Sequence, residues 1–278
     1  MSTTRRSFLS STLAASAAAA ASTGLYAQKA PASKKAAREY YELRAYRLKP
    51  GASPDLLDGY LEKAFLPALA SQKVGPVGVF TEIDVDKQAQ TGTPKADTPV
   101  WVLIRHRTLD SFVRVSTAIN TDPSVVKAGA TYLQVPKATP AFDRIDTWLY
   151  LAFAGQPTMT MPAHATSRVP TRVFEMRDYE SHSEERALSK MEMFNDGEIE
   201  VMHSLGMGPV FFGQGIAGPN LPHLRYFTSG PDLKTHLDAW KKFGPDPRWV
   251  AMKDKPQYKD NTSKNTARFL VPRPYSQI

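Results

Sequence analysis

Cysteine is absent from the 278-residue chain. Its absence excludes disulfide bonds, thiolate nucleophiles and thiolate metal ligands together. Histidine is scarce, and no two histidines have the His-x-His or i, i+4 spacing of a metal site. A glycine-rich stretch, "GQGIAG" (213–218), leads into "PNLP" rather than a helix, so we predict a hairpin there and no nucleotide site. We therefore predict no metal and no resident cofactor.

Positive charge is concentrated at the N-terminus. The chain carries +8, but six of its 35 basic residues precede Glu39 and no acidic residue does. From Glu39 onward 29 basic residues face 27 acidic ones, which leaves +2. Nucleic-acid binding needs basic residues gathered on a folded face. We therefore predict no nucleic-acid partner.

The first residues resemble an export signal. "TTRRSFLSS" (3–11) places Arg5 and Arg6 before an Ala- and Ser-rich run, as in twin-arginine (Tat) signals, although Ser10 stands where Lys is common. The run is too weakly apolar to span a membrane. We predict a Tat-type signal peptide over 1–27 and a flexible basic tail over 28–38. The mature protein would be periplasmic or extracellular, with no transmembrane segment.

A strand motif occurs twice. "YYELRAY" (40–46) returns as "FEMRDY" (174–179), an offset of 133 when Tyr41 is aligned with Phe174. The same offset superposes the two Gly-Pro-Val stretches that begin at Gly75 and Gly208. The chain is thus a tandem duplication, with one unit over 39–160, a linker over 161–170 and a second unit over 171–278.

The two units differ chiefly in one loop. Asp122-Pro123 meets Asp246-Pro247 at an offset of 124, so nine residues are lost in between. The loop over 84–99 in the first unit corresponds to the shorter loop over 217–222 in the second. The extra residues of the first unit therefore lie between its second and third strands.

Each unit has the same predicted order of elements. Period-two alternation predicts strands, and apolar residues at helical spacing predict helices between them. The first unit has predicted strands at 40–48, 75–83, 100–107 and 146–154 and helices near 53–69 and 108–119. Strand-helix-strand-strand-helix-strand is the ferredoxin-like unit. We predict an α+β fold in which two tandem ferredoxin-like units pack sheet to sheet as an intrachain dimeric α/β barrel.

These residues resemble the NIPSNAP family. The resemblance is carried by "YELRAYRLKPG" (41–51), Leu66-Pro67, the Gly-Pro-Val strands and "DPRW" (246–249), and spans about 39–272. The first unit has Val125 where the second has Trp249. The resemblance implies dimeric α/β-barrel domains, often two per chain. The roles it implies centre on protein interaction, membrane-associated sensing and vesicle traffic.

The repeated strand motif provides candidate ligand-binding residues. We expect Tyr41, Leu43 and Ala45 to face the helices, so that Glu42, Arg44 and Tyr46 face the barrel interior, as would Glu175, Arg177 and Tyr179. Trp101 and His106 on the third strand, and His223 on its counterpart, are expected to border the same cavity. An arginine fork there would hold a carboxylate or other anion. Alternatively, each glutamate simply pairs with its arginine and satisfies the interior.

Two classes of function remain open. The leading prediction is an exported NIPSNAP-like protein that binds a small ligand or a protein partner without catalysis. Association of several copies into a homo-oligomer is left open. The alternative is an enzyme that uses the barrel cavity. Related barrel families include haem peroxidases and cofactorless monooxygenases of polyphenolic substrates, and the latter would suit an interior with Tyr46, Tyr179, Trp101 and Arg177.

Overall fold

The computed structural model describes residues 37–278. The predicted signal peptide and nearly all of the predicted basic tail lie outside the described residues. Residues 37–278 belong to one compact unit.

The first half contains five strands and a helical layer. Its strands are β1 (Tyr40–Arg47), β2 (Val77–Asp86), β3 (Thr91–Pro94), β4 (Val100–His106) and β5 (Arg144–Ala152). A continuous helical stretch follows β1 and consists of α1 (Asp55–Tyr60), a π-helical segment (Leu61–Phe65) and α2 (Leu66–Ser71). Helices α3 (Leu109–Ala118), α4 (Pro123–Ala128) and α5 (Ala130–Leu133) follow β4. Helix α3 begins where the Thr108 hydroxyl accepts a hydrogen bond from the Ser111 amide, as an N-cap does.

The second half repeats this order. Its strands are β6 (Val173–Glu180), β7 (Phe211–Ala217), β8 (His223–Gly230) and β9 (Lys264–Pro272). Its helices are α7 (Glu184–Met193), α8 (Ile199–Ser204), α9 (Leu233–Phe243) and α10 (Pro247–Lys253), with the short α6 (Ala163–Thr166) before β6. No helix among residues 37–278 is long and apolar enough to cross a membrane.

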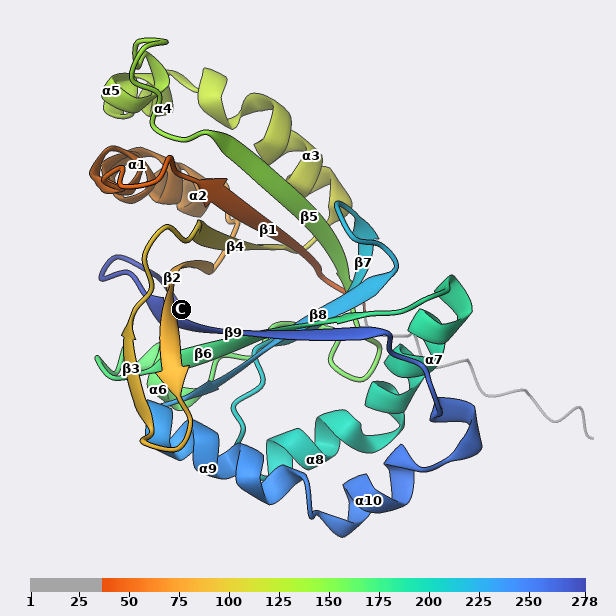
Figure 1. The fold of residues 1–278 in the computed structure, drawn as a ribbon. Coiled ribbons are helices and arrows are strands. Elements are labelled where there is room, and N and C mark those ends of the chain that lie inside the picture. Colours follow the sequence, from red (N-terminus) through yellow and green to blue (C-terminus); the bar gives the residue numbers. More distant parts are fainter. Residues whose placement is uncertain (1–36) are drawn as a thin grey trace, which may run out of the picture. The chain divides into compact units, whose positions relative to one another are not determined.

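Eight strands close into an antiparallel barrel. Their order is β2-β4-β1-β5-β7-β8-β6-β9, and β9 pairs back with β2. The two seams join one half to the other, at Ala152 beside Gly213 and at Ile83 beside Phe269. In Figure 1 the helices of the first half cover one side of the barrel and those of the second half cover the opposite side. The predicted fold class is confirmed.

The extra residues of the first half form a hairpin that reaches the second half. Strand β3 pairs only with β2, and the two extend past the barrel toward α9 (Figure 1). The Gln90 side-chain amide donates to the carboxylate of Asp238 on α9 over 2.9 Å. The extra residues of the longer loop therefore have a structural role, because they fasten β2 and β3 of the first half to α9 of the second.

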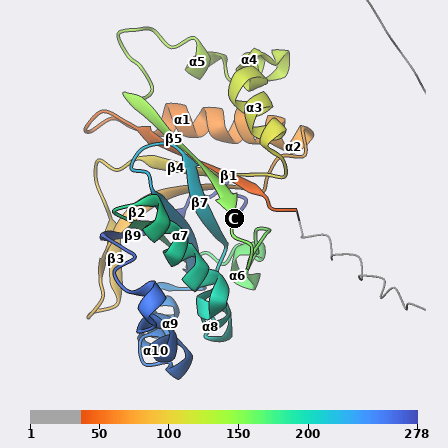
Figure 2. The ribbon, with the colours of Figure 1, turned by 90° about the vertical axis from the view of Figure 1, so that its right-hand side faces the viewer.

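Three apolar layers hold the fold together. The barrel interior is filled by aromatic and aliphatic side chains from both halves, including Tyr41, Phe80, Phe174, Phe211 and Phe227. Two outer cores lie between the strands and the helices of each half. Figure 2 shows the same layers after a quarter turn, with the strands between the two helical groups.

The facing predicted for the repeated motif is wrong. Tyr41, Leu43 and Ala45 lie in the barrel interior, whereas Tyr46 belongs to the outer core beside the helices. The same inversion applies to the second half, where Phe174 lies inside. Both faces of these strands are buried, so alternation separates two faces without showing which one meets the helices. The interior receives large side chains from both sheets and is therefore the more apolar face.

One end of the barrel is filled by the protein itself. Ile278 is fully buried in the interior core, and its carbonyl oxygen accepts a hydrogen bond of 3.1 Å from the Arg172 guanidinium. Glu39 pairs with Arg105 at the same end. The opposite end, where β1 and β6 finish and β8 and β9 begin, contains a cavity.

Candidate functional site

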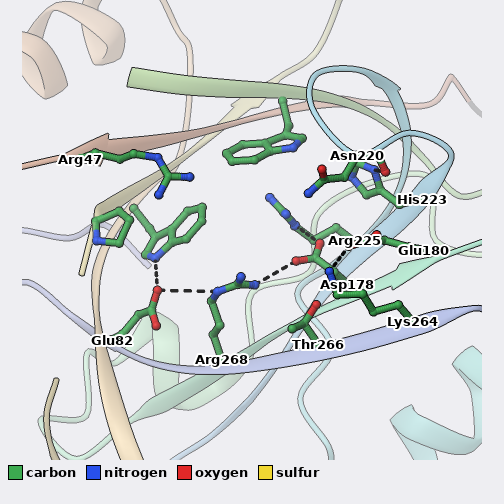
Figure 3. Close-up of a pocket in the computed structure, with 13 residues that line it drawn as sticks. Arg47, Glu82, Asp178, Glu180, Asn220, His223, Arg225, Lys264, Thr266 and Arg268 are labelled. Carbon is green, nitrogen blue, oxygen red and sulfur yellow. Dashed lines mark hydrogen bonds and ion pairs between the residues drawn. The ribbon is translucent and has the colours of Figure 1, made fainter. Parts of the chain in front are cut away.

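A cavity of about 220 Å³ opens at this second end of the barrel. Its walls combine charged and aromatic side chains (Figure 3): Arg47, Glu82, Pro99, Trp101, Trp148, Asp178, Glu180, Asn220, His223, Arg225, Lys264, Thr266 and Arg268. These residues come from both halves of the chain. The site therefore requires the closed barrel, and neither half alone would form it.

Arg225 is the most buried cation of this cavity. Its side chain is 5% exposed, and its Nε donates to Asp178, which is 6% exposed. Its guanidinium carbon lies 4.6 Å from the ring centroid of Trp148, in cation–π geometry. Nη1 is buried and makes no hydrogen bond of standard geometry among residues 37–278, while the Tyr150 hydroxyl is a polar neighbour of the guanidinium. A buried guanidinium nitrogen without a partner is costly, which makes it a natural receptor for a ligand anion.

A chain of polar contacts holds Arg225 in position. Asp178 also accepts from Arg268 Nη1 over 3.1 Å. Arg268 Nε lies 3.7 Å from Glu82, and Glu82 accepts a 3.0 Å hydrogen bond from the indole nitrogen of Trp101. Figure 3 shows the contacts of Arg268 with Glu82 and with Asp178 as dashed lines. Both carboxylates thus already have protein donors, and the network fixes Arg225 in the cavity wall.

His223 and Tyr150 form a neutral pair beside this network. Nδ1 of His223 lies 3.0 Å from the Asn220 carbonyl, which can only accept, so Nδ1 carries the proton. Nε2 then accepts from the Tyr150 hydroxyl over 3.1 Å. Burial, together with the nearby charge of Arg225, lowers the pKa of His223, and burial raises the pKa of Tyr150. Neither side chain carries charge near pH 7.

The cavity is asymmetric although the chain is duplicated. Asp178 and Arg225 are cross-strand neighbours on β6 and β8, and their counterparts in the first half are Ala45 and Trp101, also cross-strand neighbours. An ion pair on one wall thus faces an apolar pair on the other. The sequence prediction missed Asp178, Arg225 and Arg268. Comparison of the two repeats at the offsets of 133 and 124 would have singled out the first two.

The predicted residues of the first half lie away from the cavity, with one exception. Arg44 Nε contacts Glu42 over 2.5 Å, and its guanidinium lies 5.1 Å from the ring centroid of Phe65 in the helical layer. The ring nitrogens of His106 contact Glu42 (3.1 Å) and the Ser111 hydroxyl (2.7 Å), so His106 does not border the cavity. Trp101 does line it.

The corresponding residues of the second half are also on the helix side. Glu175 accepts from His236 on α9 over 2.8 Å, and the Tyr179 hydroxyl meets that of Tyr226 over 2.9 Å. Arg177 lies over the ring of Trp240, 4.3 Å from its centroid. The residues predicted to share the barrel interior therefore lie apart in the structure. Of the two histidines expected to border the cavity, His223 lines it and His106 does not.

His106 and His223, the two histidines predicted to border the cavity, do not fit a haem site. Both ring nitrogens of His223 and of His106 have protein partners. Within residues 37–278 no cluster of three metal-ligating side chains occurs. The cavity is also lined by paired charges, whereas a haem macrocycle needs an apolar slot.

Fold and site together define a single-chain dimeric α/β-barrel protein with a charged cavity at one mouth. Its second half matches the NIPSNAP family over residues 174–277, which supports the family resemblance for that half. No curated protein matches the chain.

Solved structures share the fold at low sequence identity. A candidate monooxygenase from Lactobacillus acidophilus NCFM aligns over 84% of this chain and 94% of its own, with 7% identity and a TM-score of 0.52. An uncharacterised NIPSNAP-like domain protein from Burkholderia xenovorans covers 38% of this chain and 90% of its own, with 15% identity and a TM-score of 0.36. A NIPSNAP family protein from Agrobacterium tumefaciens covers 38% and 96%, with 16% identity and a TM-score of 0.34. The first of these likenesses shows the complete barrel fold.

Proposed function

We propose that this chain is an exported NIPSNAP-like protein, built from two such units, that binds a small organic anion at the barrel mouth. The observation that carries the proposal is the buried Nη1 of Arg225, which has no partner among the described residues and sits in a cavity walled by aromatic rings. A carboxylate would satisfy this nitrogen with a charge-assisted hydrogen bond.

The charged groups of the cavity leave Arg225 as its buried anion receptor. Four cations line it, Arg47, Arg225, Lys264 and Arg268, with the three carboxylates of Glu82, Asp178 and Glu180, and Arg47 is paired with Asp146 outside the lining. All three carboxylates have protein partners, including Glu180, which contacts Lys264 over 3.3 Å. Trp101 and Trp148 supply apolar surface beside Arg225. A small carboxylate with a flat apolar body matches these features.

Binding without catalysis is the favoured role. The groups able to move a proton, His223 and Tyr150, are hydrogen-bonded to one another and to the backbone. A catalytic base must reach its substrate directly or through one water. The carboxylates of the cavity are held in ion pairs. We infer that the cavity recognises its ligand and releases it unchanged.

A cofactorless monooxygenase is the second candidate. The neutral imidazole of His223 in the cavity wall favours it, because a neutral Nε2 would accept a phenolic proton if the Tyr150 hydroxyl turned away. The shared fold with the candidate monooxygenase is compatible with this role. Oxygen consumption on addition of a polyphenol, lost in His223→Gln, would support the enzyme over the binding protein.

Export by the Tat pathway is part of the proposal. It is supported by Arg5 and Arg6 and the Ala- and Ser-rich run that follows them. Replacement of both arginines by lysine should retain the protein inside the cell, which fractionation and immunoblotting would measure. Normal export of the double variant would contradict this part.

The binding function is tested by native mass spectrometry of the full chain recovered from the compartment to which it is exported, with an absorbance scan of the same sample. We expect a small anion bound in a 1:1 complex and no Soret band. The bound mass should be lost from Arg225→Lys and kept in Arg107→Lys, an exposed arginine outside the cavity. A bound mass that is unaffected by Arg225→Lys would contradict the proposal.

A further inference from the structure

A second cavity, of about 300 Å³, lies on the outer side of β6, between this strand and α9. Its lining is Lys87, Glu175, Arg177, Leu237, Trp240, Lys241 and Phe269. None of these residues lines the barrel mouth. The second cavity is therefore a separate place on the molecule.

The two copies of the repeated arginine behave differently. In the first half, Arg44 is 12% exposed, contacts Glu42 over 2.5 Å through Nε and reaches the Tyr46 hydroxyl over 3.4 Å. In the second half, Arg177 is 22% exposed and its Nη1 lies 3.7 Å from Glu175, beyond hydrogen-bond distance. Its Nε is buried without a partner among the described residues. Arg177 thus retains donor capacity that Arg44 has lost.

The histidine partner of the glutamate comes from a different element in each half. In the second half, His236 on α9 contacts the Glu175 carboxylate over 2.8 Å. Gly230 makes this possible, because a Cβ at position 230 would lie 2.7 Å from the Cβ of His236. The first half has His106 at the position of Gly230, so there the imidazole comes from the strand instead of the helix.

The rest of the cavity is apolar with a basic rim. Leu237, Trp240 and Phe269 form its apolar surface, and Leu237 and Phe269 are nearly fully buried. Lys87 and Lys241 stand at the rim, with the Lys87 ammonium 5.8 Å from the ring centroid of Phe269. Such a combination suits a ligand with one negative end and an apolar body.

The long hairpin of the first half supplies one wall of this cavity. Lys87 belongs to the β2–β3 hairpin of the first half, which Gln90 fastens to Asp238 on α9. Figure 1 shows β3 beside α9. The second half has only the short loop over 217–222 and cannot supply the same wall to the first half. The nine extra residues thus complete this cavity.

We propose that this cavity binds an amphipathic monocarboxylate of the medium-chain fatty-acid class, with its carboxylate on Arg177 and its chain against Trp240 and Phe269. This binding is independent of the barrel-mouth site, because Arg225 and its partners take no part in it.

The test uses the four tryptophans as separate reporters. The full chain is labelled with 5-fluorotryptophan, and each fluorine resonance is assigned by single Trp→Phe replacement. Octanoate is titrated as the probe, and 1-octanol serves as its uncharged match. We expect octanoate to shift the Trp240 resonance to saturation while the Trp101 and Trp148 resonances stay in place. We expect 1-octanol to bind roughly tenfold or more weakly, since it forms no charge-assisted hydrogen bond.

Variants separate the two sites. Arg177→Met should weaken octanoate binding roughly tenfold or more and leave 1-octanol unchanged. Arg225→Lys, the variant that tests the barrel mouth, should leave octanoate binding at Trp240 unchanged. Equal affinity for octanoate and 1-octanol in the unmodified chain, which requires no variant to fold, would overturn the proposal. A shift confined to Trp101 or Trp148 would also overturn it, and would place the fatty acid at the barrel mouth.

Discussion

The guanidinium of Arg225 lies over the indole of Trp148, 4.6 Å from the ring centroid, at the seam between the two halves. Arg225 comes from β8 of the second half and Trp148 from β5 of the first. Asp178 holds one edge of the guanidinium, while Nη1 on another edge has no partner among residues 37–278. One cation is thus fixed in orientation by both halves and still able to bind an anion.

Replacement of Asp178 by Asn should change stability and binding in opposite directions. Breaking a buried ion pair on one side typically costs about 3–5 kcal/mol, so the free energy of unfolding should fall by a similar amount. At the same time Arg225 Nε would be released from its ion pair. This should strengthen the binding of benzoate, which serves as the probe because it is a small carboxylate with a flat apolar ring. Urea unfolding and calorimetric titration measure the two effects. Loss of both stability and binding would mean that Asp178 and Arg225 form only a structural pair.

Stability should decline as the solution is acidified below neutral pH, partly because of His223. Its pKa is lowered from the ordinary 6.5, chiefly by burial. The unfolded chain therefore takes up a proton that the folded chain refuses, and stability is lost as the pH falls from about 7 through 6.5. The decline should be shallower in His223→Gln, which keeps an acceptor for Tyr150. His164 and His203, whose pKa values burial also lowers, would account for the remaining slope. The free energy of unfolding is measured between pH 7.5 and 5.5 for both proteins. An equally steep decline in His223→Gln and in the unmodified chain would contradict this explanation.

The buried pair of Lys190 and Glu198 offers a test of the second outer core. Their side chains lie 2.9 Å apart and are 6% and 2% exposed. Burial raises the pKa of Glu198 despite the nearby ammonium. Lys190→Met should destabilise the protein by about 3–5 kcal/mol, because it leaves the carboxylate buried alone.

Adding Glu198→Leu to Lys190→Met should restore most of that loss, because a neutral apolar pair has no desolvation penalty. Thermal and urea unfolding of both single variants and the double variant form the cycle that measures the coupling. Additive losses in the double variant would show that the two side chains do not interact.

The shared interior should make the two halves unfold together. Phe80 of the first half packs against Phe174 and Phe227 of the second, with ring centroids 5.0 and 5.8 Å apart. Phe80→Ala should cost about 3–5 kcal/mol by leaving a cavity in this core. We expect a single urea transition, at lower urea concentration and with unchanged slope. Two separate transitions, with only the first moved by the substitution, would contradict a common core.

Much of the fold was predictable from the repeat. Two copies of strand-helix-strand-strand-helix-strand specify two sheets, and each sheet leaves one face bare unless the other covers it. Which set of side chains on β1 and β6 meets the helices was not predictable. Glu42 and Glu175 are buried on the helix side because His106 and His236 contact them there. Alternation identifies the two sets of side chains, but the choice between them depends on partners more than 60 residues away in the chain.

The candidate site was predictable only in part. Of the residues proposed for it, Trp101 and His223, on matching strands, line the cavity in the structure. Asp178 and Arg225 differ from their repeat counterparts Ala45 and Trp101, and that divergence marks the wall on which the two halves are no longer equivalent. Arg268 had no such signal, since its importance arises from the closure of β9 onto β2.

Calorimetric titration of the full chain with benzoate tests the central claim most directly. We predict one binding site, weakened roughly tenfold or more in Arg225→Lys, since lysine keeps the charge but loses the second donor of the guanidinium fork. Arg107→Lys, the matched exposed control, should bind like the unmodified chain. Equal benzoate affinity in all three proteins, each with an unchanged unfolding temperature, would contradict the assignment of Arg225 as the anion receptor.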